Sequence, residues 1–190
     1  STVFYPNGKE VHVPTPALDN INVSARPVGT VENWRKVFNM IIARGDYELL
    51  AMSLVGPASL LMNFTKFNGC VYHLGSSDSG TGKSTALYMC NSVYGHPDKL
   101  AAIWKDTLAA KMLHLGIMNN LPFTVDEITN ISPADFSTLA YSMSQGRGAN
   151  RSKSSANELR TNTTTWQTMS LASSNASFYE KLGVHKNSPD

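Results

Sequence analysis

Residues 75–85 read Gly-Ser-Ser-Asp-Ser-Gly-Thr-Gly-Lys-Ser-Thr. The apolar run Cys70–Leu74 precedes this stretch and predicts a buried strand, and the segment Lys83–Tyr94 predicts a helix. A glycine-rich loop that joins a buried strand directly to a helix favours an α/β fold, in which the strand lies in a sheet flanked by helices.

The residue types in this loop indicate phosphate binding by a P-loop. Gly80 and Gly82 permit positive φ angles, so that successive N–H groups point toward a phosphate at the start of the helix. Lys83 can reach the β- and γ-phosphates of ATP, and the Ser84 hydroxyl can bind Mg²⁺. The residues predicted to hold the nucleotide are Ser79, Gly80, Thr81, Gly82, Lys83, Ser84 and Thr85. In the pattern G-x-x-x-x-G-K-[ST] the first glycine falls on Ser77, so the entry to the loop is atypical.

A second candidate element is the apolar run Leu121–Val125, which ends in Asp126 and Glu127. Paired carboxylates at the end of a buried strand are typical of a Walker B element. We expect Asp126 to hold the Mg²⁺ shell and Glu127 to act as general base toward the attacking water. The chain has no Asn-Lys-x-Asp motif, which favours adenine over guanine.

The strand predicted at residues 165–172 ends in a polar run that includes Ser174 and Asn175. The Asn175 side chain is predicted to orient water or contact the γ-phosphate, with Ser174 as the alternative. The predicted catalytic residues are therefore Lys83, Glu127 and Asn175.

The remaining periodicity predicts alternating helices and strands, and hence a mostly parallel sheet. The expected helices are residues 31–42, 46–62, 107–118 and 133–143, and a further strand is expected at 100–104. Residues 1–30 contain four prolines and predict an arm or linker, so the expected domains are an arm at 1–30 and an ATPase core at 31–190.

Residues 144–163 form a polar excursion before the last strand. Gly146 and Gly148 flank its first cation, Arg147, and Arg151, Lys153 and Arg160 follow.

The composition is that of one globular domain. The chain has 190 residues, of which 42% are apolar and 16% charged, and its net charge of +2 does not by itself indicate a nucleic-acid partner. We expect two reduced cysteines, no membrane span and a cytoplasmic location. The chain begins at Ser1 and ends soon after its last predicted strand, so we expect a piece of a longer polypeptide.

From Tyr72 to about Asn175 the sequence resembles the uncharacterised P-loop domain of primase-helicase proteins from phages and mobile elements. That domain belongs to the AAA+ branch that contains the MCM and superfamily 3 helicases. The matching elements are His73-Leu-Gly, Ser79-Gly-Thr-Gly-Lys-Ser-Thr-Ala-Leu87, Ser92-Val-Tyr-Gly95, Trp104-Lys-Asp-Thr107, Val125-Asp-Glu-Ile128, Ala140-Tyr141, Gly146, Gly148, Arg151, Trp166 and Leu171.

The resemblance implies a three-layer αβα AAA+ core whose parallel sheet has the strand order 5-1-4-3-2. It further implies a hexameric ring and ATP-driven movement on single-stranded DNA. It also implies that the polar excursion is a hairpin before the last strand, whose Arg147, Arg151 and Lys153 contact nucleic acid. Such cations on a glycine-bordered hairpin suit contacts to a phosphate backbone, although a solvated loop with ordinary surface charge is the alternative. A viral version would work in the cytoplasm of a bacterial host. No arginine follows Arg160, so the arginine finger and the C-terminal lid of that branch are not in this chain.

Three functions are compatible with these motifs. The first is the ATP-hydrolysing motor of a replicative DNA helicase. The second is an ATP-switched assembly or loader module that does not unwind duplex DNA, which has the same loop. A small-molecule kinase is disfavoured, because an Asp-Glu strand end suits water activation better than an acceptor hydroxyl.

Overall fold

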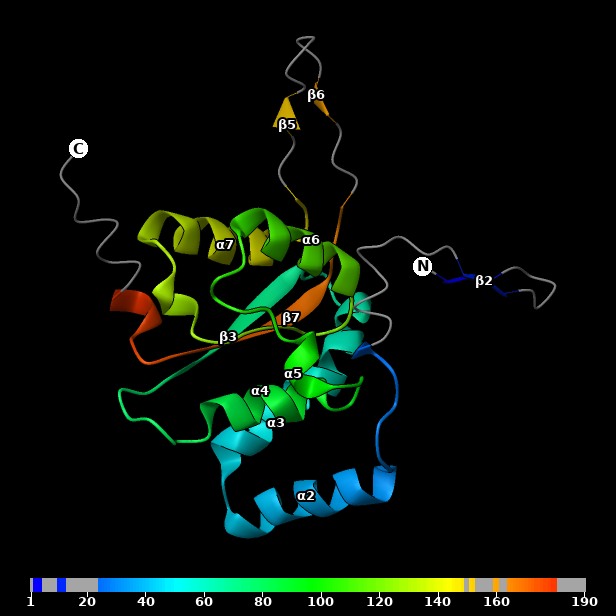
Figure 1. The fold of residues 1–190 in the computed structure, drawn as a ribbon, viewed down its shortest axis with the longest axis vertical. Helices are drawn as coiled ribbons and strands as arrows, with labels where there is room; N and C mark the ends of the chain where they lie inside the picture. Colours follow the sequence, from blue (N-terminus) through cyan, green and yellow to red (C-terminus); the bar gives the residue numbers. More distant parts are fainter. Residues whose placement is uncertain are drawn as a thin grey trace.

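The computed structural model describes residues 24–148 and 164–180, together with the backbone of four short strands outside these ranges. Within it, β3 (Gly69–Gly75), β7 (Thr168–Ser174) and β4 (Phe123–Val125) form a parallel sheet in the order β3-β7-β4. β7 pairs with β3 along its whole length, and β3 and β7 lie side by side at the centre of the molecule (Figure 1). The last strand of this sheet in the sequence is therefore the middle strand in space.

The prediction of a strand at residues 100–104 is wrong, except that Ala102 pairs with the sheet. The helix α5 (Pro97–Leu100) occupies the start of that segment, because Pro97 has its φ angle preset for the first helical position. Ala102 then forms a single parallel bridge with Val125. Its N–H donates to Thr124 O at 2.9 Å, and its carbonyl accepts from the Asp126 N–H at 3.3 Å.

The strand order agrees with the part of the expected sheet that is present. If β3, β4 and β7 are strands 1, 3 and 4, their observed order is 1-4-3, and the Ala102 bridge lies where strand 2 is expected. In residues 24–148 and 164–180, no strand pairs with the outer edge of β3, where strand 5 is expected. The chain is thus an α/β protein with a small parallel sheet.

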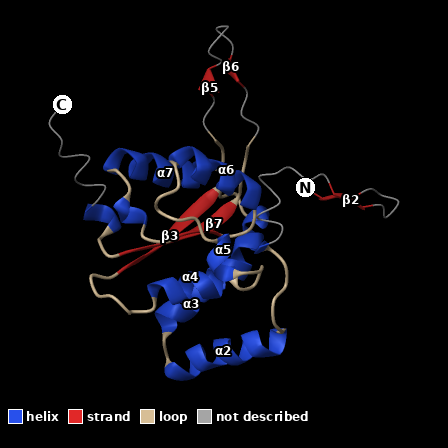
Figure 2. Ribbon diagram, viewed as in Figure 1, coloured by secondary structure: helices blue, strands red, loops and turns tan. Residues whose placement is uncertain are grey.

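Helices cover both faces of this sheet (Figure 2). On one face, α6 (Leu108–Met118) and α7 (Pro133–Gln145) bury a cluster that includes Ala172 and Phe136. On the other face, α3 (Tyr47–Ser59) and α4 (Lys83–Asn91) bury a cluster that includes Leu171 and Leu87. Neighbouring residues of β7 enter different clusters, because successive side chains of a strand point to opposite faces.

The helices α2 (Val31–Arg44) and α3 lie before β3, as the periodicity predicts. α2 begins after Thr30, whose hydroxyl caps the first turn, and ends at Gly45 in the left-handed conformation. The second helix, α3, contains Pro57 and is followed by the 3-10 helix η1 (Leu60–Phe64). Among the described residues α2 is the longest helix, with 14 residues, and none of them is long and apolar enough to cross a membrane.

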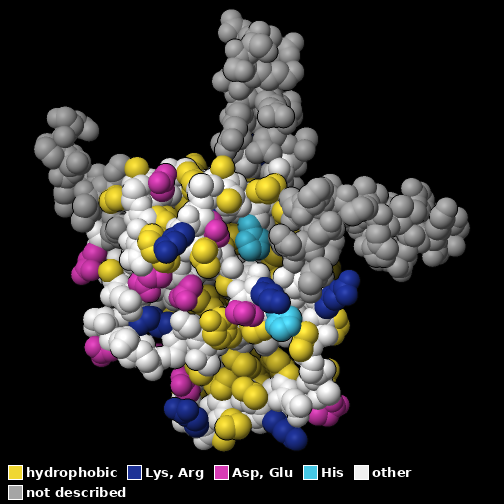
Figure 3. Space-filling model, viewed as in Figure 1, with side chains coloured by type: hydrophobic (Ala, Val, Ile, Leu, Met, Phe, Trp, Pro, Cys, Tyr) yellow, Lys and Arg dark blue, Asp and Glu magenta, His cyan; other side chains and the backbone are white. Residues whose placement is uncertain are grey.

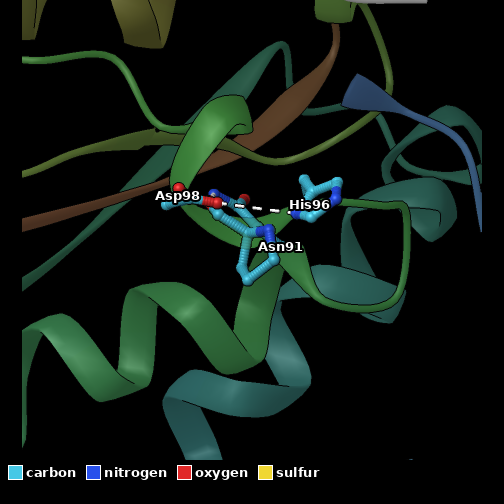
Figure 4. Close-up of polar contacts among 4 residues, drawn as sticks. Asn91, His96 and Asp98 are labelled. Carbon is cyan, nitrogen blue, oxygen red and sulfur yellow. Dashed lines mark hydrogen bonds and ion pairs between the residues drawn. The ribbon is translucent and has the colours of Figure 1, made fainter. Parts of the chain in front are cut away.

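Asn91 fixes the end of α4, which stops three residues before the expected Tyr94. Its amide donates to Pro97 O at 3.0 Å and to Thr124 Oγ1 at 2.8 Å, so one buried side chain joins α4, α5 and β4. Figure 4 shows Asn91 beneath α5, where His96 Nδ1 lies 3.8 Å from Asp98 Oδ1. These contacts hold the helix that starts at the glycine-rich loop against the sheet.

Two antiparallel pairs lie outside the sheet. β1 (Thr2–Phe4) pairs with β2 (Glu10–His12) within the predicted arm. β5 (Arg151–Ser152) pairs with β6 (Leu159–Arg160), and Figure 1 places these strands beyond α6 and α7. Arg147 forms an antiparallel bridge with Thr165 nearer the sheet. The backbone between α7 and β7 therefore has the hairpin pairing predicted for the polar excursion.

Leu171→Ala is expected to lower the free energy of unfolding by about 2–5 kcal/mol, because the removed side chain is fully buried between β7, α3 and α4. Urea denaturation followed by circular dichroism measures this change. Leu113→Ala is the matched control, since Leu113 is 52% exposed on α6, and it should change stability by no more than about 0.5 kcal/mol. Equal effects would contradict the assignment of Leu171 to the core.

Candidate functional site

The loop between β3 and α4 has the conformation that its glycines predict. Gly80 has a φ angle of 74° and Gly82 one of 91°. At both positions there is room for a Cβ atom. Glycine is therefore favoured here by its backbone conformation and not by crowding. α4 begins at Lys83 without a side-chain cap, which leaves the N–H groups of its first turn available to a ligand.

The Lys83 ammonium is held inside this loop by oxygen atoms of the loop itself. Its Nζ donates to Asp78 O at 2.8 Å and to Ser76 O at 3.1 Å, and it lies 3.5 Å from Thr81 Oγ1. The positive charge of Lys83 thus lies beside the free N–H groups at the start of α4. Both features would attract a bound anion.

The Asp126 carboxylate accepts hydrogen bonds from two hydroxyl groups that belong to different elements. Ser84 Oγ, in the first turn of α4, donates to Asp126 Oδ2 at 3.3 Å, and Ser173 Oγ, in β7, donates to Asp126 Oδ1. The half-buried carboxylate therefore lies between the loop helix and the central strand. Hydroxyl and carboxylate oxygens are metal ligands of the kind that Mg²⁺ prefers.

The described residues contain no cluster of three or more His, Cys, Asp or Glu side chains that could hold a metal ion. Mg²⁺ sites in proteins do not require such a cluster, because Mg²⁺ commonly keeps several waters and binds through one or two carboxylates together with phosphate.

Glu127 has a strained backbone beside this group. Its φ angle of 54° lies in the left-handed region, which is uncommon for residues other than glycine. Its N–H donates to Ser173 Oγ at 3.2 Å, and its Oε1 accepts from the Asn175 N–H at 3.1 Å. Strained residues held by several contacts are concentrated at functional sites, so the position of the Glu127 carboxylate is a candidate functional constraint.

Asn175 contributes to the site through its backbone. Its N–H binds Glu127, and the residue is exposed. The alternative, Ser174, points away from the loop helix: its hydroxyl contacts His73 Nε2 at 2.7 Å and donates to Ala176 O. Desolvation lowers the pKa of the His73 side chain below its usual value.

Ser173 is the site residue that sequence reasoning missed. It is fully buried and contacts both Asp126 and the Glu127 N–H. The alternation of the last strand could have identified it, because Ser173 shares a face with Leu171, which packs against α4.

The structure gathers the predicted phosphate, metal and general-base residues at the carboxyl ends of three strands. Of the predicted nucleic-acid residues, only Arg147 is fully described, and it lies apart from this group. Arg147 is exposed and bridges Thr165, just before the amino end of β7. Arg151 lies in β5, of which only the backbone is described, and Lys153 lies outside the described residues.

A groove among the described residues lies away from this site. A cavity of about 720 Å³ separates α2 from the ends of α4 and α5, and its walls include Val31, Trp34 and Met89. Figure 3 shows a corresponding group of hydrophobic side chains on this face.

Comparison with protein families shows where the chain belongs. Residues 1–164 match the family described as "Domain of unknown function (DUF927)". The chain belongs to the DUF927 family. No curated protein was found to match this DUF927 sequence.

A solved structure described as "SCCmec type IV Cch - active helicase" is similar to this DUF927 chain. The two share 26% sequence identity over 83% of the chain, with a TM-score of 0.60. The chain spans only 29% of the length of that protein.

Ser173→Ala is expected to lower the free energy of unfolding by about 1–3 kcal/mol, since it leaves the Glu127 N–H and one Asp126 oxygen without their partner. Ser170→Ala, on the same strand, is the control: the Ser170 hydroxyl is buried and has no hydrogen-bond partner. Its removal should be neutral or stabilising. Chemical denaturation of both variants measures the difference, and a neutral Ser173→Ala would contradict the network.

Proposed function

We propose that this DUF927 chain is the ATP-binding and ATP-hydrolysing core of a DNA helicase of the mobile-element or phage primase-helicase type. The observation that carries the proposal is the contact between Ser84 and Asp126 at 3.3 Å, beside a lysine held inside a glycine-rich loop. A phosphate-binding loop and a metal-binding carboxylate must be adjacent to hold Mg²⁺ and ATP together.

Each residue has a distinct proposed role. The loop N–H groups and Lys83 bind the β- and γ-phosphates, which would replace the carbonyl oxygens of Ser76 and Asp78 as partners of Lys83. Ser84 and Asp126 hold Mg²⁺, which would offset negative charge on the phosphates. Glu127, oriented by the Asn175 N–H, accepts the proton of the attacking water.

Ser173 is proposed to act through these residues without contacting ATP. Its hydroxyl holds Asp126 and the Glu127 N–H at the same time, so the metal-binding carboxylate and the general base are placed by one side chain. The remaining loop residues Ser79, Gly80, Thr81, Gly82 and Thr85 line the path of the phosphates in this proposal.

The helicase assignment is supported by the similarity to a protein described as an active helicase. We propose that the chain works within a larger polypeptide as a hexameric ring on single-stranded DNA, in the cytoplasm. The five-strand AAA+ order 5-1-4-3-2 belongs to the same proposal, and the observed 1-4-3 order supports it. The arginine finger would come from sequence outside this chain, because no arginine follows Arg160.

Lys83→Ala and Glu127→Gln are expected to separate binding from hydrolysis. Lys83→Ala should abolish binding of a fluorescent ATP analogue, because the loop loses its only ammonium group. Glu127→Gln should bind with unchanged affinity and stop phosphate release, since the amide cannot accept the water proton. Phosphate release is measured on the full-length polypeptide.

Lys99→Ala is the matched control for these variants. Lys99 is exposed on α5, away from the loop, and its loss should leave binding and hydrolysis unchanged. Parent-level hydrolysis by Glu127→Gln would show that Glu127 is not the base. A strand-displacement assay on the full-length polypeptide distinguishes a helicase from an ATP-switched loader.

The hairpin is expected to bind the DNA backbone through its cations. Arg147→Ala combined with Arg151→Ala should weaken binding of single-stranded DNA and lower the salt slope by about 0.7 per lost phosphate contact, with ATP binding unchanged. Fluorescence anisotropy across a salt series measures both. Arg35→Ala with Lys36→Ala removes two exposed cations from α2 and is the control. Identical salt slopes in the two double variants would refute the hairpin contact.

A further inference from the structure

The loop between α5 and α6 exposes an aromatic side chain and a cation side by side. Trp104 is 39% exposed, and the preceding Ile103 is 52% exposed. The Lys105 ammonium lies 5.4 Å from the centre of the Trp104 ring, within the range of a cation–π contact. These two side chains belong neither to the proposed ATP site nor to the hairpin.

The loop is held in one conformation by its own hydrogen bonds. The Ile103 N–H donates to Asp106 Oδ2 at 3.0 Å, and the Asp106 N–H donates to Ile103 O at 3.1 Å. Thr107 then caps α6 by accepting from the Ala110 N–H at 3.2 Å. Trp104 and Lys105 therefore lie at the tip of a closed turn and not on a long open loop.

The buried side chain of Lys111 forms hydrogen bonds with backbone carbonyl groups of this turn. Lys111, in α6, is only 1% exposed, and its Nζ donates to Trp104 O at 3.1 Å and to Asp106 O. Desolvation lowers the pKa of Lys111, and Asp106 and Asp135 act in the opposite direction. Burial of an ammonium is costly, and an apolar residue of similar size would avoid that cost. Two backbone carbonyl groups of the loop are the hydrogen-bond partners that offset this cost.

The loop leaves the sheet beside the proposed metal site. Ala102 pairs in parallel with Val125, and its carbonyl accepts from the Asp126 N–H at 3.3 Å. Residues 103–106 follow directly, so the loop departs from the same edge of the sheet as Asp126. Ala102, which immediately precedes the loop, is thus hydrogen-bonded to Asp126, the residue proposed to hold Mg²⁺.

We propose that Trp104 and Lys105 form a contact for single-stranded nucleic acid, in which a base stacks on the indole ring and the ammonium binds the adjoining phosphate. Aromatic rings bind bases with little sequence preference, because every base has a π face, and a neighbouring cation serves the backbone. Lys111 is a positioning residue for this contact. The inference rests on the proposed nucleic-acid function and adds a base-stacking site distinct from the hairpin.

Binding of oligothymidylate and of an abasic strand of equal length separates stacking from charge. Trp104→Ala should weaken oligothymidylate binding about 5- to 150-fold and leave the abasic strand unchanged. Trp104→Phe should retain the preference for bases. Lys105→Ala should weaken both strands and lower the salt slope by about 0.7. Tyr141→Ala, which removes another exposed aromatic ring, is the control.

Lys111→Met tests the positioning role, because it keeps the buried stem and removes the donor to Trp104 O. It should lose the preference for oligothymidylate while ATP binding stays at the parent level. An unchanged preference in a folded Lys111→Met variant would overturn that role. Folding is checked by thermal unfolding, and Trp104→Ala tests the site independently of this buried position.

The outcomes distinguish this inference from the proposed function. If the hairpin double variant weakens binding and Trp104→Ala has no effect on either strand, only the stacking site is overturned. If Trp104→Ala instead lowers self-association in sedimentation without changing oligonucleotide affinity, the surface joins copies of the chain and the inference is wrong. Absence of oligonucleotide binding by the parent chain at low salt would overturn both.

Discussion

The pairing of β7 between β3 and β4 is the constraint on which the rest of the structure depends. β7 and β3 are paired over seven residues although they lie about a hundred residues apart in the chain. Because the three strands are parallel, their carboxyl ends meet at one edge of the sheet. The glycine-rich loop, the Asp126-Glu127 pair and the end of β7 converge there, which is where ligands bind in open α/β sheets.

The same register determines both the core and the site. Leu171 packs against α4, and Ser173, two residues later on the same face, contacts Asp126. Ser174 points to the opposite face, where its hydroxyl meets His73. A slip of one residue would exchange these faces, so it would remove Leu171 from its cluster and Ser173 from Asp126 together. The packing that stabilises β7 therefore also protects the arrangement of the site.

Two costly local features lie along this edge, and each is held by several neighbours. Glu127 has a left-handed backbone conformation and is bound by Ser173 and Asn175. Lys111 is a buried cation whose partners are carbonyl oxygens of the Trp104 loop. A residue optimised only for stability would be glycine at the first position and apolar at the second. Both positions are better explained by the placement of neighbouring groups than by stability.

The sequence by itself determined the strand–loop–helix element, the acidic strand end, the α/β class and most helices. These features depend on local chemistry: positive φ at Gly80 and Gly82, helical periodicity, and caps such as Thr30 and Ser132. Sequence reasoning failed at residues 100–104, where Pro97 starts a helical turn and only Ala102 pairs with the sheet. Only the tertiary structure decided that Ser173 binds Asp126, that the Asn175 N–H binds Glu127, and that Lys111 binds the Trp104 carbonyl. Each of these contacts joins residues from different elements, and their geometry depends on strand register and helix packing, which no local pattern specifies.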